Sequence, residues 1–134
     1  MQSNGSITKD GINKLIDYLE FFQNKESVFY TEKKGCWVES SEVSEFRNEL
    51  SDSNFLMVFD WVQWLSENNV FKDINNNLNS SEIMKADLET LRKLMTSYIR
   101  GDRFNEGLFI HVILKGHVTR IILRLRELSK SGEL

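Results

Sequence analysis

Four charged side chains crowd into one short stretch between two apolar segments: Arg100, Asp102, Arg103 and Glu106. Arg103 and Glu106 are three residues apart, so on a helix they share a face and can pair. Burying charged groups is costly unless they are paired and hydrogen-bonded. The cluster therefore has two interpretations. It is either a partly buried, mutually paired corner that ties helices together, which we favour, or a polar pocket for an anionic or amide-bearing ligand.

An apolar segment upstream supplies the element that we expect beside this cluster. Residues 54–65 are the most apolar stretch of the chain, and a helix that is apolar nearly all round is usually buried. Asp60 is a good helix N-cap, and Gln63 follows three residues on, as in a capping box. Phe59 and Trp64 occupy the two positions of a hydrophobic staple. We therefore predict a helix that begins at Asp60. The candidate binding site then consists of Asp60, Trp61, Trp64, Arg100, Asp102, Arg103 and Glu106.

Other chemistry-bearing residues lack the spacing that catalysis or metal binding requires. His111 and His117 are six residues apart across a predicted helix break, so they do not share one helical face as metal ligands would. Cys36 is the only cysteine, so an internal disulfide is excluded, and it has no local signature of a nucleophile. No glycine-rich phosphate loop is present. The sequence thus predicts no catalytic residue, no metal site and no cofactor.

Charge and hydropathy indicate the cellular location of the protein and the kinds of partner that it can bind. The first eleven residues lack the basic and apolar regions of a secretory signal, and no apolar run approaches the ~18 residues that span a bilayer. These features, with the single cysteine, predict a cytoplasmic protein without a membrane segment. Residues 1–80 carry 7 positive and 13 negative side chains, and residues 81–134 carry 10 and 7, which gives net charges of −6 and +3. We interpret this asymmetry as attraction between the halves of one fold, and we do not favour nucleic acid as a partner.

The periodicity of apolar residues predicts one mostly α-helical domain. The chain has no proline, and residues 27–38 favour a small β-hairpin. We expect a flexible tail at 1–6, then a compact bundle of five or six helices over 7–134. The segments with helical spacing are 8–23, 41–51, a helix from Asp60, 82–100, 103–115 and 117–130.

Two boundaries in the C-terminal half have specific caps. A polar connection at 73–81 leads to the strongest apolar stripe, which runs from Met84 to Tyr98, and Ser80 or Ser81 is the expected cap of that helix. Asp102 is placed to cap the helix that follows. The C-terminal half is therefore predicted to be three helices joined by short corners.

Together these motifs resemble a bacterial family that is classified only as a domain of unknown function. The resemblance rests on the segments 86–94 and 100–107, on Phe59-Asp60-Trp61 with Trp64, and on Gly116 and 122–125. It covers about residues 10–130. This chain has Asn105 where the family pattern has cysteine, so the resemblance transfers no thiol chemistry. It implies a bacterial origin and no particular activity.

Three functions stay open at this point. We favour a non-enzymatic interaction domain that binds a protein partner or a second copy of itself. The second hypothesis is a small-molecule or hydrolytic site built on Asp60, Arg100, Arg103 and Glu106. The third is nucleic-acid binding by the C-terminal helices, since residues 92–130 contain nine basic and three acidic side chains.

Overall fold

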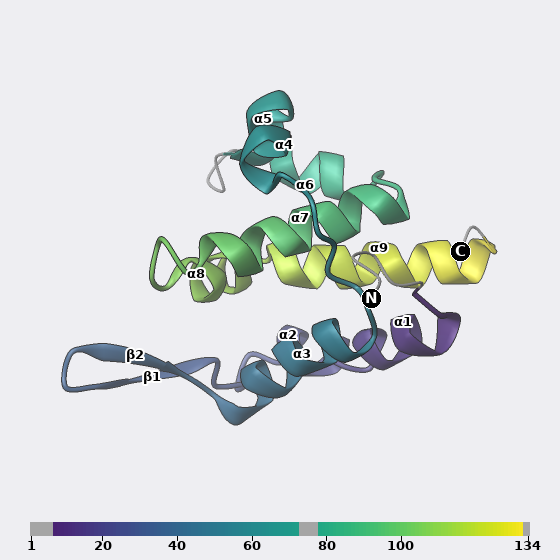
Figure 1. The fold of residues 1–134 in the computed structure, drawn as a ribbon. Helices are drawn as coiled ribbons and strands as arrows, with labels where there is room; N and C mark the ends of the chain where they lie inside the picture. The colour runs from purple at the N-terminus through teal and green to yellow at the C-terminus, as the bar shows by residue number, and fades with distance from the viewer. Residues whose placement is uncertain (1–6, 73–77, 133–134) are drawn as a thin grey trace.

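The computed structural model describes residues 7–72 and 78–132 of the chain (Figure 1). Helices make up 64% of the structure, and one small antiparallel hairpin accompanies them, so the predicted mostly α class with a hairpin is confirmed. The tail predicted at 1–6 lies outside the described residues. In chain order the elements are α1 (Lys9–Ile16), α2 (Leu19–Gln23), β1 (Tyr30–Lys33), β2 (Cys36–Glu39), α3 (Ser41–Asp52), α4 (Trp61–Glu67), α5 (Asn69–Lys72), α6 (Leu78–Ile83), α7 (Leu88–Gly101), α8 (Leu108–Leu114) and α9 (His117–Ser131).

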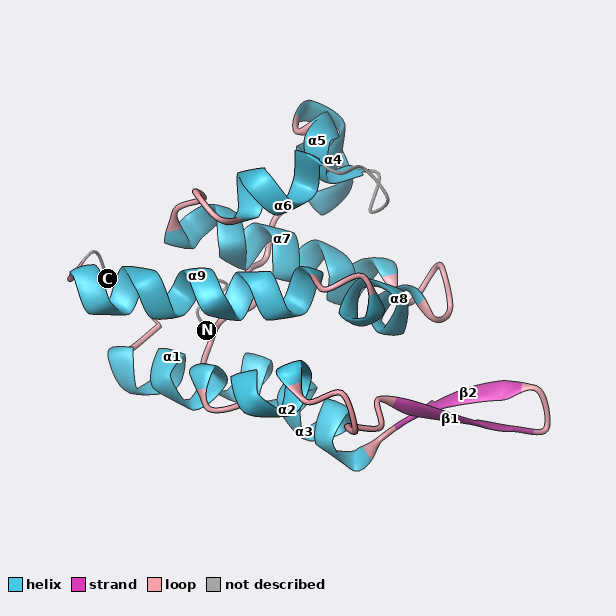
Figure 2. Ribbon diagram, turned by 180° about the vertical axis from the view of Figure 1, so that it is seen from behind, coloured by secondary structure: helices cyan, strands magenta, loops and turns pink. Residues whose placement is uncertain are grey.

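The helices pack around α9. This helix contacts α1 and α2 on one side and α6 and α7 on the other, and α8 packs against it as well (Figures 1 and 2). Its buried apolar stripe runs from Val118 to Leu128, as its spacing predicted. Side chains from both halves of the chain meet there, including Ile12, Phe46 and Leu91, and these form one hydrophobic core.

The segment 8–23 was predicted as one helix, but it forms two. α1 begins as expected, because the Thr8 hydroxyl accepts a hydrogen bond of 3.0 Å from the Gly11 amide. The break falls at residues 17–18, where the Tyr18 amide bonds to the Leu15 carbonyl, three residues back. This tighter turn lets the Tyr18 ring meet the Phe46 ring edge-on at 5.2 Å, while Leu19 and Phe22 in α2 stay buried.

The predicted hairpin projects from the helical body (Figures 1 and 2). Lys34 and Gly35 connect its strands with φ angles of 52° and 79°, which is the type I′ turn that suits the twist of a two-residue hairpin. The register pairs Tyr30 with Glu39 and Lys33 with Cys36. β2 leads directly into α3, whose Ser40 cap accepts a hydrogen bond from the Val43 amide.

The apolar segment 54–65 is only partly buried, contrary to our expectation. Phe55 is buried, but α4 contains no buried residue, and Val62 is 60% exposed. The helix does begin after Asp60, as predicted. It packs mainly on α5 and α7, and Val62 lies on the side of α4 that is left open to solvent.

The strongest helix begins later than its periodicity indicated. α7 begins at Leu88, and its cap is Asp87, which accepts a hydrogen bond of 2.9 Å from the Thr90 amide. Ser80 lies instead within a separate short helix, α6. A turn after Ile83 separates α6 from α7, so Met84 is not part of α7. Of the polar connection predicted at 73–81, residues 73–77 lie outside the described residues.

The corner after α7 is also longer than predicted. The next helix, α8, begins at Leu108 and not at 103. Residues 102–107 form hydrogen-bonded turns, in which the Phe104 and Asn105 amides both donate to the Gly101 carbonyl at 3.0 Å. Gly107, at φ 88°, ends these turns in the left-handed region that favours glycine. Asp102, Arg103 and Glu106 of the predicted charged cluster therefore lie on a loop between two helices, and Arg100 lies in the last turn of α7.

Candidate interaction surface

Trp61 lies against the junction of α7 and α8. The space beside the Gly101 Cα is filled by Leu108 and by the Trp61 ring: a methyl group there would lie 3.0 Å from the Leu108 side chain and 3.8 Å from Trp61. A side chain at 101 would thus push these two apart. Because glycine has no side chain, the start of α4 can lie close to the end of α7 at this position. This contact places Trp61 beside Gly101, which lies between Arg100 and Asp102 in the chain.

Arg103 and Glu106 are not the buried pair that we predicted. Both are exposed, and the ion pairs found in residues 7–72 and 78–132 include neither of them. The physical reason is local. A spacing of three residues brings side chains together on a helix, but residues 102–107 form turns. Arg100, at the end of α7, is half-buried and has no carboxylate within ion-pair distance in the described part of the chain.

Asp102 is the member of the cluster that does hold the corner together. One carboxylate oxygen accepts a hydrogen bond of 2.9 Å from the Phe109 amide, in the first turn of α8. Contrary to our prediction, the N-cap residue of α8 is Gly107, and Asp102 binds an amide of the first turn from six positions before the start of that helix. The other oxygen lies 3.0 Å from the guanidinium of Arg47 on α3.

Arg47 is the functional group that the sequence analysis missed. Its guanidinium forms two hydrogen bonds to Glu39 at the end of β2, one of them 2.7 Å long, and lies 4.6 Å from the centre of the Phe109 ring. Burial lowers the pKa of Arg47, but the hydrogen bonds and charges of Glu39 and Asp102 outweigh this effect and raise it. One cation thus joins the hairpin, α3 and the α7–α8 loop.

A signal for Arg47 was present in the sequence. It is the only basic residue between Lys34 and Lys72, and it lies in a helix that carries four acidic side chains. A single cation among so many carboxylates on a surface helix is a candidate for a specific partner. Its actual partner, Asp102, is 55 residues away in the chain, and no local pattern identifies such a contact.

Asp60 and Trp64 have structural roles. The Asp60 carboxylate accepts a hydrogen bond of 3.0 Å from the Gln63 amide, which is the predicted cap. The Trp64 ring stacks on Phe71 with centroids 5.7 Å apart, and it meets Phe59 edge-on at 6.2 Å, as the staple predicted. The Gln63 side chain, in contrast, donates to Glu67 and does not complete a capping box.

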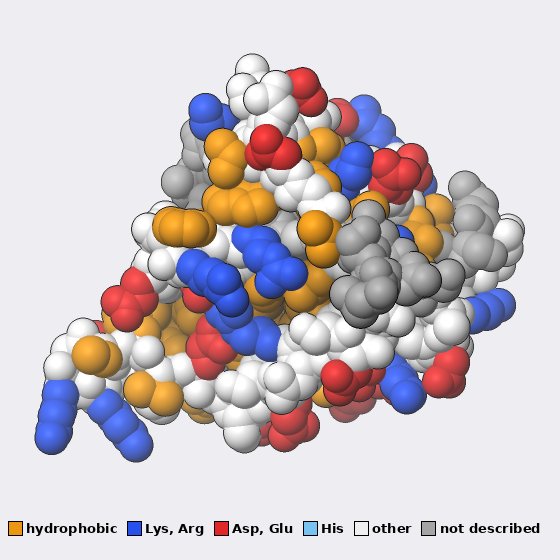
Figure 3. Space-filling view, viewed as in Figure 1, with side chains coloured by type: hydrophobic (Ala, Val, Ile, Leu, Met, Phe, Trp, Pro, Cys, Tyr) orange, Lys and Arg blue, Asp and Glu red, His pale blue; other side chains and the backbone are white. Residues whose placement is uncertain are grey.

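Trp61, which is half-buried, and Phe104, which is exposed, form an aromatic pair, and Phe104 follows Arg103 in the chain. Their rings stack with centroids 6.3 Å apart, and Phe104 is 81% exposed. Figure 3 shows hydrophobic side chains on this face next to a group of Lys and Arg side chains. We use the name aromatic–arginine surface for five residues: Trp61, Val62, Arg100, Arg103 and Phe104.

Several basic residues of the C-terminal half are engaged within the chain. Arg92 donates to the carbonyls of Asn54 and Phe55. Arg120 donates to the Lys115 carbonyl and Arg124 to the Ala86 carbonyl. These guanidinium groups act as ties between elements, which reduces the set available to contact phosphates.

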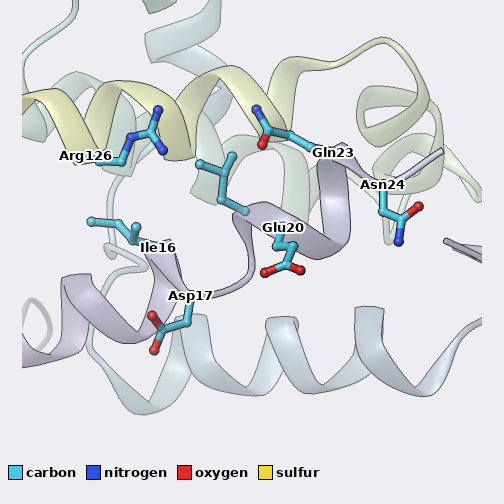
Figure 4. A pocket seen from close by; sticks show the side chains of 7 residues that line it. Ile16, Asp17, Glu20, Gln23, Asn24 and Arg126 are labelled. Atoms are coloured by element: carbon cyan, nitrogen blue, oxygen red, sulfur yellow. The ribbon is translucent and has the colours of Figure 1, made fainter. Parts of the chain in front are cut away.

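A hollow elsewhere on the molecule shows no convergence of chemical groups. It has a volume of about 630 Å³ and lies open to solvent between α1, α2 and α9. Arg126 reaches toward it from α9, whereas the Asp17 and Glu20 carboxylates point away from Arg126 (Figure 4). The hollow is lined by Ile16, Asp17, Leu19, Glu20, Gln23, Asn24 and Arg126, so it contains none of the predicted site residues.

A search of the described residues for metal ligands and membrane segments found none. Residues 7–72 and 78–132 contain no cluster of three or more His, Cys, Asp or Glu side chains that could hold a metal ion. Over the same ranges no helix combines the length and the apolar character needed to cross a bilayer.

The comparisons with known proteins agree with the resemblance drawn from the sequence. No curated protein and no solved structure was found to match the chain. The model of one family, described as a family of unknown function, matches residues 7–131. Because that match covers nearly the whole chain, the chain belongs to the family of unknown function DUF6508.

Proposed function

We propose that this chain is a non-enzymatic protein-interaction domain that binds its partner at the aromatic–arginine surface. The observation that carries this proposal is the exposure of Phe104, whose side chain is 81% accessible and yet stacked on Trp61. Exposed apolar groups rimmed by polar ones mark interaction sites. Aromatic residues and arginine are also the types that dominate binding energy at protein interfaces.

The charges of this surface favour an acidic partner segment with an aromatic or aliphatic anchor. Arg103 is exposed, Arg100 is half-buried, and within residues 7–72 and 78–132 neither has an ion-pair partner. A carboxylate from a partner would therefore gain an arginine without displacing an internal ion pair. An apolar side chain beside that carboxylate would cover Phe104 and Val62. Electrostatic complementarity of this kind selects partners and speeds their association.

The surroundings of the surface support binding over catalysis. Asp60 is occupied as a helix cap, and Asp102 is occupied by Arg47 and the Phe109 amide. The second hypothesis placed Asp60, Arg100, Arg103 and Glu106 in one site, but Asp60 caps α4 and Glu106 is exposed on the loop. The engaged guanidiniums of Arg92, Arg120 and Arg124 likewise argue against nucleic acid as the partner.

We further propose a cytoplasmic location, since Cys36 is an exposed free thiol, a group typical of reducing compartments.

A displayed random-peptide library tests this function without knowledge of the natural partner. The wild-type chain should enrich acidic peptides that contain an aromatic or leucine residue. Synthetic forms of these peptides should bind Phe104→Ser at least about tenfold more weakly, the loss expected for a hot-spot side chain. Leu114→Ser is the matched control, because Leu114 is also an exposed apolar residue, at 55%, but lies at the far end of α8.

Two results would contradict the proposal. One is a selection that enriches no common peptide class. The other is equal loss of binding in Phe104→Ser and Leu114→Ser, which would mean that the peptides recognise some other surface. Replacement of Arg103 by glutamine should lower the affinity for acidic peptides more than the affinity for neutral ones. If the preference for acidic peptides stayed the same, the arginines would not be the groups that select them.

A further inference from the structure

In the described part of the chain, no strand pairs with the outer edge of β2. The Ser40 amide donates to the Phe29 carbonyl at 2.9 Å, and hydrogen-bonded pairs alternate along an antiparallel ladder. Within the hairpin the hydrogen-bonded pairs are therefore Thr31–Val38 and Lys33–Cys36. Trp37 lies between them in a non-hydrogen-bonded pair with Glu32. Its N–H and C=O consequently point away from β1, toward the outside of the hairpin.

This edge is also apolar, unlike the edge of β1. Cys36 is exposed, and Trp37 and Val38 are 44% and 43% exposed. β1 instead carries Glu32 and Lys33, and charged residues, lysine above all, protect strand edges from pairing. A two-stranded hairpin is marginally stable by itself, and further strands or packing stabilise it. The edge of β2 thus has both the unused backbone groups and the side chains of a pairing strand.

We propose that β2 pairs with β2 of a second copy of this chain, antiparallel across a two-fold axis at Trp37. In this register Trp37 faces Trp37 of the second copy and exchanges two backbone hydrogen bonds with it. Cys36 then faces Val38 of the second copy on both sides of the axis. Every residue from 36 to 38 meets an apolar residue, so the edge is self-complementary. The two hairpins become one four-stranded sheet.

The neighbouring registers fit less well. Only shifts that keep Trp37 opposite an outward-pointing residue preserve the hydrogen bonds. A shift in one direction places Trp37 opposite Glu39, whose carboxylate is bound to Arg47. A shift in the other direction places it opposite Gly35, in the turn. The Trp37–Trp37 register is therefore the one in which no charged residue or turn faces the central tryptophan.

The first test is the oligomeric state as a function of concentration. The contact is small, so the dimer should be weak. The average sedimentation coefficient should therefore rise from the monomer value as the protein concentration increases. Trp37→Lys should abolish this rise, because it places two lysines opposite each other on the axis. Val28→Lys is the matched control, since Val28 is 56% exposed but lies outside β2. Both variants should keep the wild-type melting temperature to within a few degrees, because neither side chain is buried.

The second test fixes the register by disulfide formation. Cys36 and residue 38 of the second copy would form a non-hydrogen-bonded pair with Cα atoms roughly 4.5 Å apart, within disulfide range. Wild-type chain is mixed with the double variant Cys36→Ser/Val38→Cys under mild oxidation. The mixed disulfide should form several-fold faster than either homodisulfide. Addition of Trp37→Lys to both chains should remove this advantage, because the two lysines then face each other on the axis.

Three outcomes would overturn the inference. The chain could stay monomeric at every concentration tested, or Trp37→Lys could dimerise as the wild type does. A homodisulfide of Cys36 that forms fastest would place Cys36 on the axis and refute the register. Phe104→Ser should dimerise normally, because the hairpin is not part of the aromatic–arginine surface. A failure of the chain to dimerise through β2 is thus distinguishable from a failure of the aromatic–arginine surface to bind peptides.

Discussion

Replacement of Arg47 by alanine should destabilise the fold more than any other single change of a charged residue on α3. The substitution removes the cation that lies between Glu39 and Asp102. It leaves two carboxylates facing each other with no positive charge between them. It also removes the guanidinium from the face of Phe109, 4.6 Å away.

The magnitude follows from how far these groups are covered. The Arg47, Glu39 and Asp102 side chains are 25%, 22% and 23% exposed. Exposed pairs contribute about 1 kcal/mol or less, whereas removal of one partner from a buried pair costs about 3–5 kcal/mol. Because these groups lie nearer the buried case, we expect Arg47→Ala to lower the free energy of unfolding by about 2–4 kcal/mol. Arg47→Lys should lose about half as much, since it keeps the charge but not the two-pronged hydrogen bonding.

Chemical denaturation followed by circular dichroism measures this difference directly. Lys14→Ala is the matched control, because Lys14 forms an ion pair of 3.6 Å with Asp10 at side-chain exposures of 58% and 82%. That control should change the free energy of unfolding by less than about 0.5 kcal/mol. If Arg47→Ala were as stable as the control, the Glu39–Arg47–Asp102 network would be a surface contact with no structural role.

Three further changes have expected outcomes. Leu91→Ala should cost about 2–5 kcal/mol in denaturation experiments, because Leu91 is fully buried in α7, and a loss below about 0.5 kcal/mol would contradict its place in the core. Arg103→Ala and Glu106→Ala should each change stability little, and a double-mutant cycle should give a coupling near zero, because both side chains are exposed; a coupling above about 1 kcal/mol would restore the buried pair. Burial raises the pKa of the Tyr98 hydroxyl well above its usual value of 10.0, an effect that Arg120 opposes only in part, so the folded chain retains this proton when the unfolded chain has lost it. Stability should therefore fall above about pH 10, by up to about 1.4 kcal/mol per pH unit from this group, and alkaline denaturation of Tyr98→Phe should lack that component.

The features that the sequence predicted best are those that depend on residues close together in the chain. The apolar stripes of α7 and α9 have helical spacing, and their residues are buried as expected: Leu91, Met95 and Tyr98 in α7, and Val118, Ile121, Ile122, Leu125 and Leu128 in α9. The Asp60 cap is a contact between residues three apart, so a local pattern identifies it. The hairpin was predicted for the same reason, since its turn and strand residues are neighbours in the chain.

Helix boundaries and burial were harder to predict, because they depend on what packs against each segment. Periodicity could not tell that Asp87 would cap α7 in place of Ser80 or Ser81, since aspartate and serine both cap helices. The apolar character of 54–65 predicted burial, but no element within residues 7–72 and 78–132 covers Val62, which is 60% exposed. An apolar segment that the fold leaves open is itself informative, and it is the reason why this part of the surface carries the proposed function.

The candidate site was predicted in part for a related reason. Trp61, Arg100 and Arg103 were singled out by their types, but Phe104, the most exposed aromatic side chain described, was treated as part of a motif. Pairing of Arg103 with Glu106 assumed a helix that the structure replaces with turns. The contact of Asp102 with Arg47 spans 55 residues, so it follows from the tertiary fold and not from any local spacing.

The same network relates the two proposed surfaces to each other. Glu39 ends the strand that we pair with a second copy, and Asp102 begins the loop that carries Phe104, and Arg47 binds both carboxylates. A dimer formed through β2 would therefore hold its two aromatic–arginine surfaces at a defined separation. A partner that repeats its acidic segment could then engage both surfaces at once, and such bivalent binding raises apparent affinity by about 10²–10⁴ when the geometry allows it. Trp37→Lys would remove that gain while the affinity for a single segment stays unchanged, so the hairpin would act on how tightly a partner is held and not on which partner is chosen.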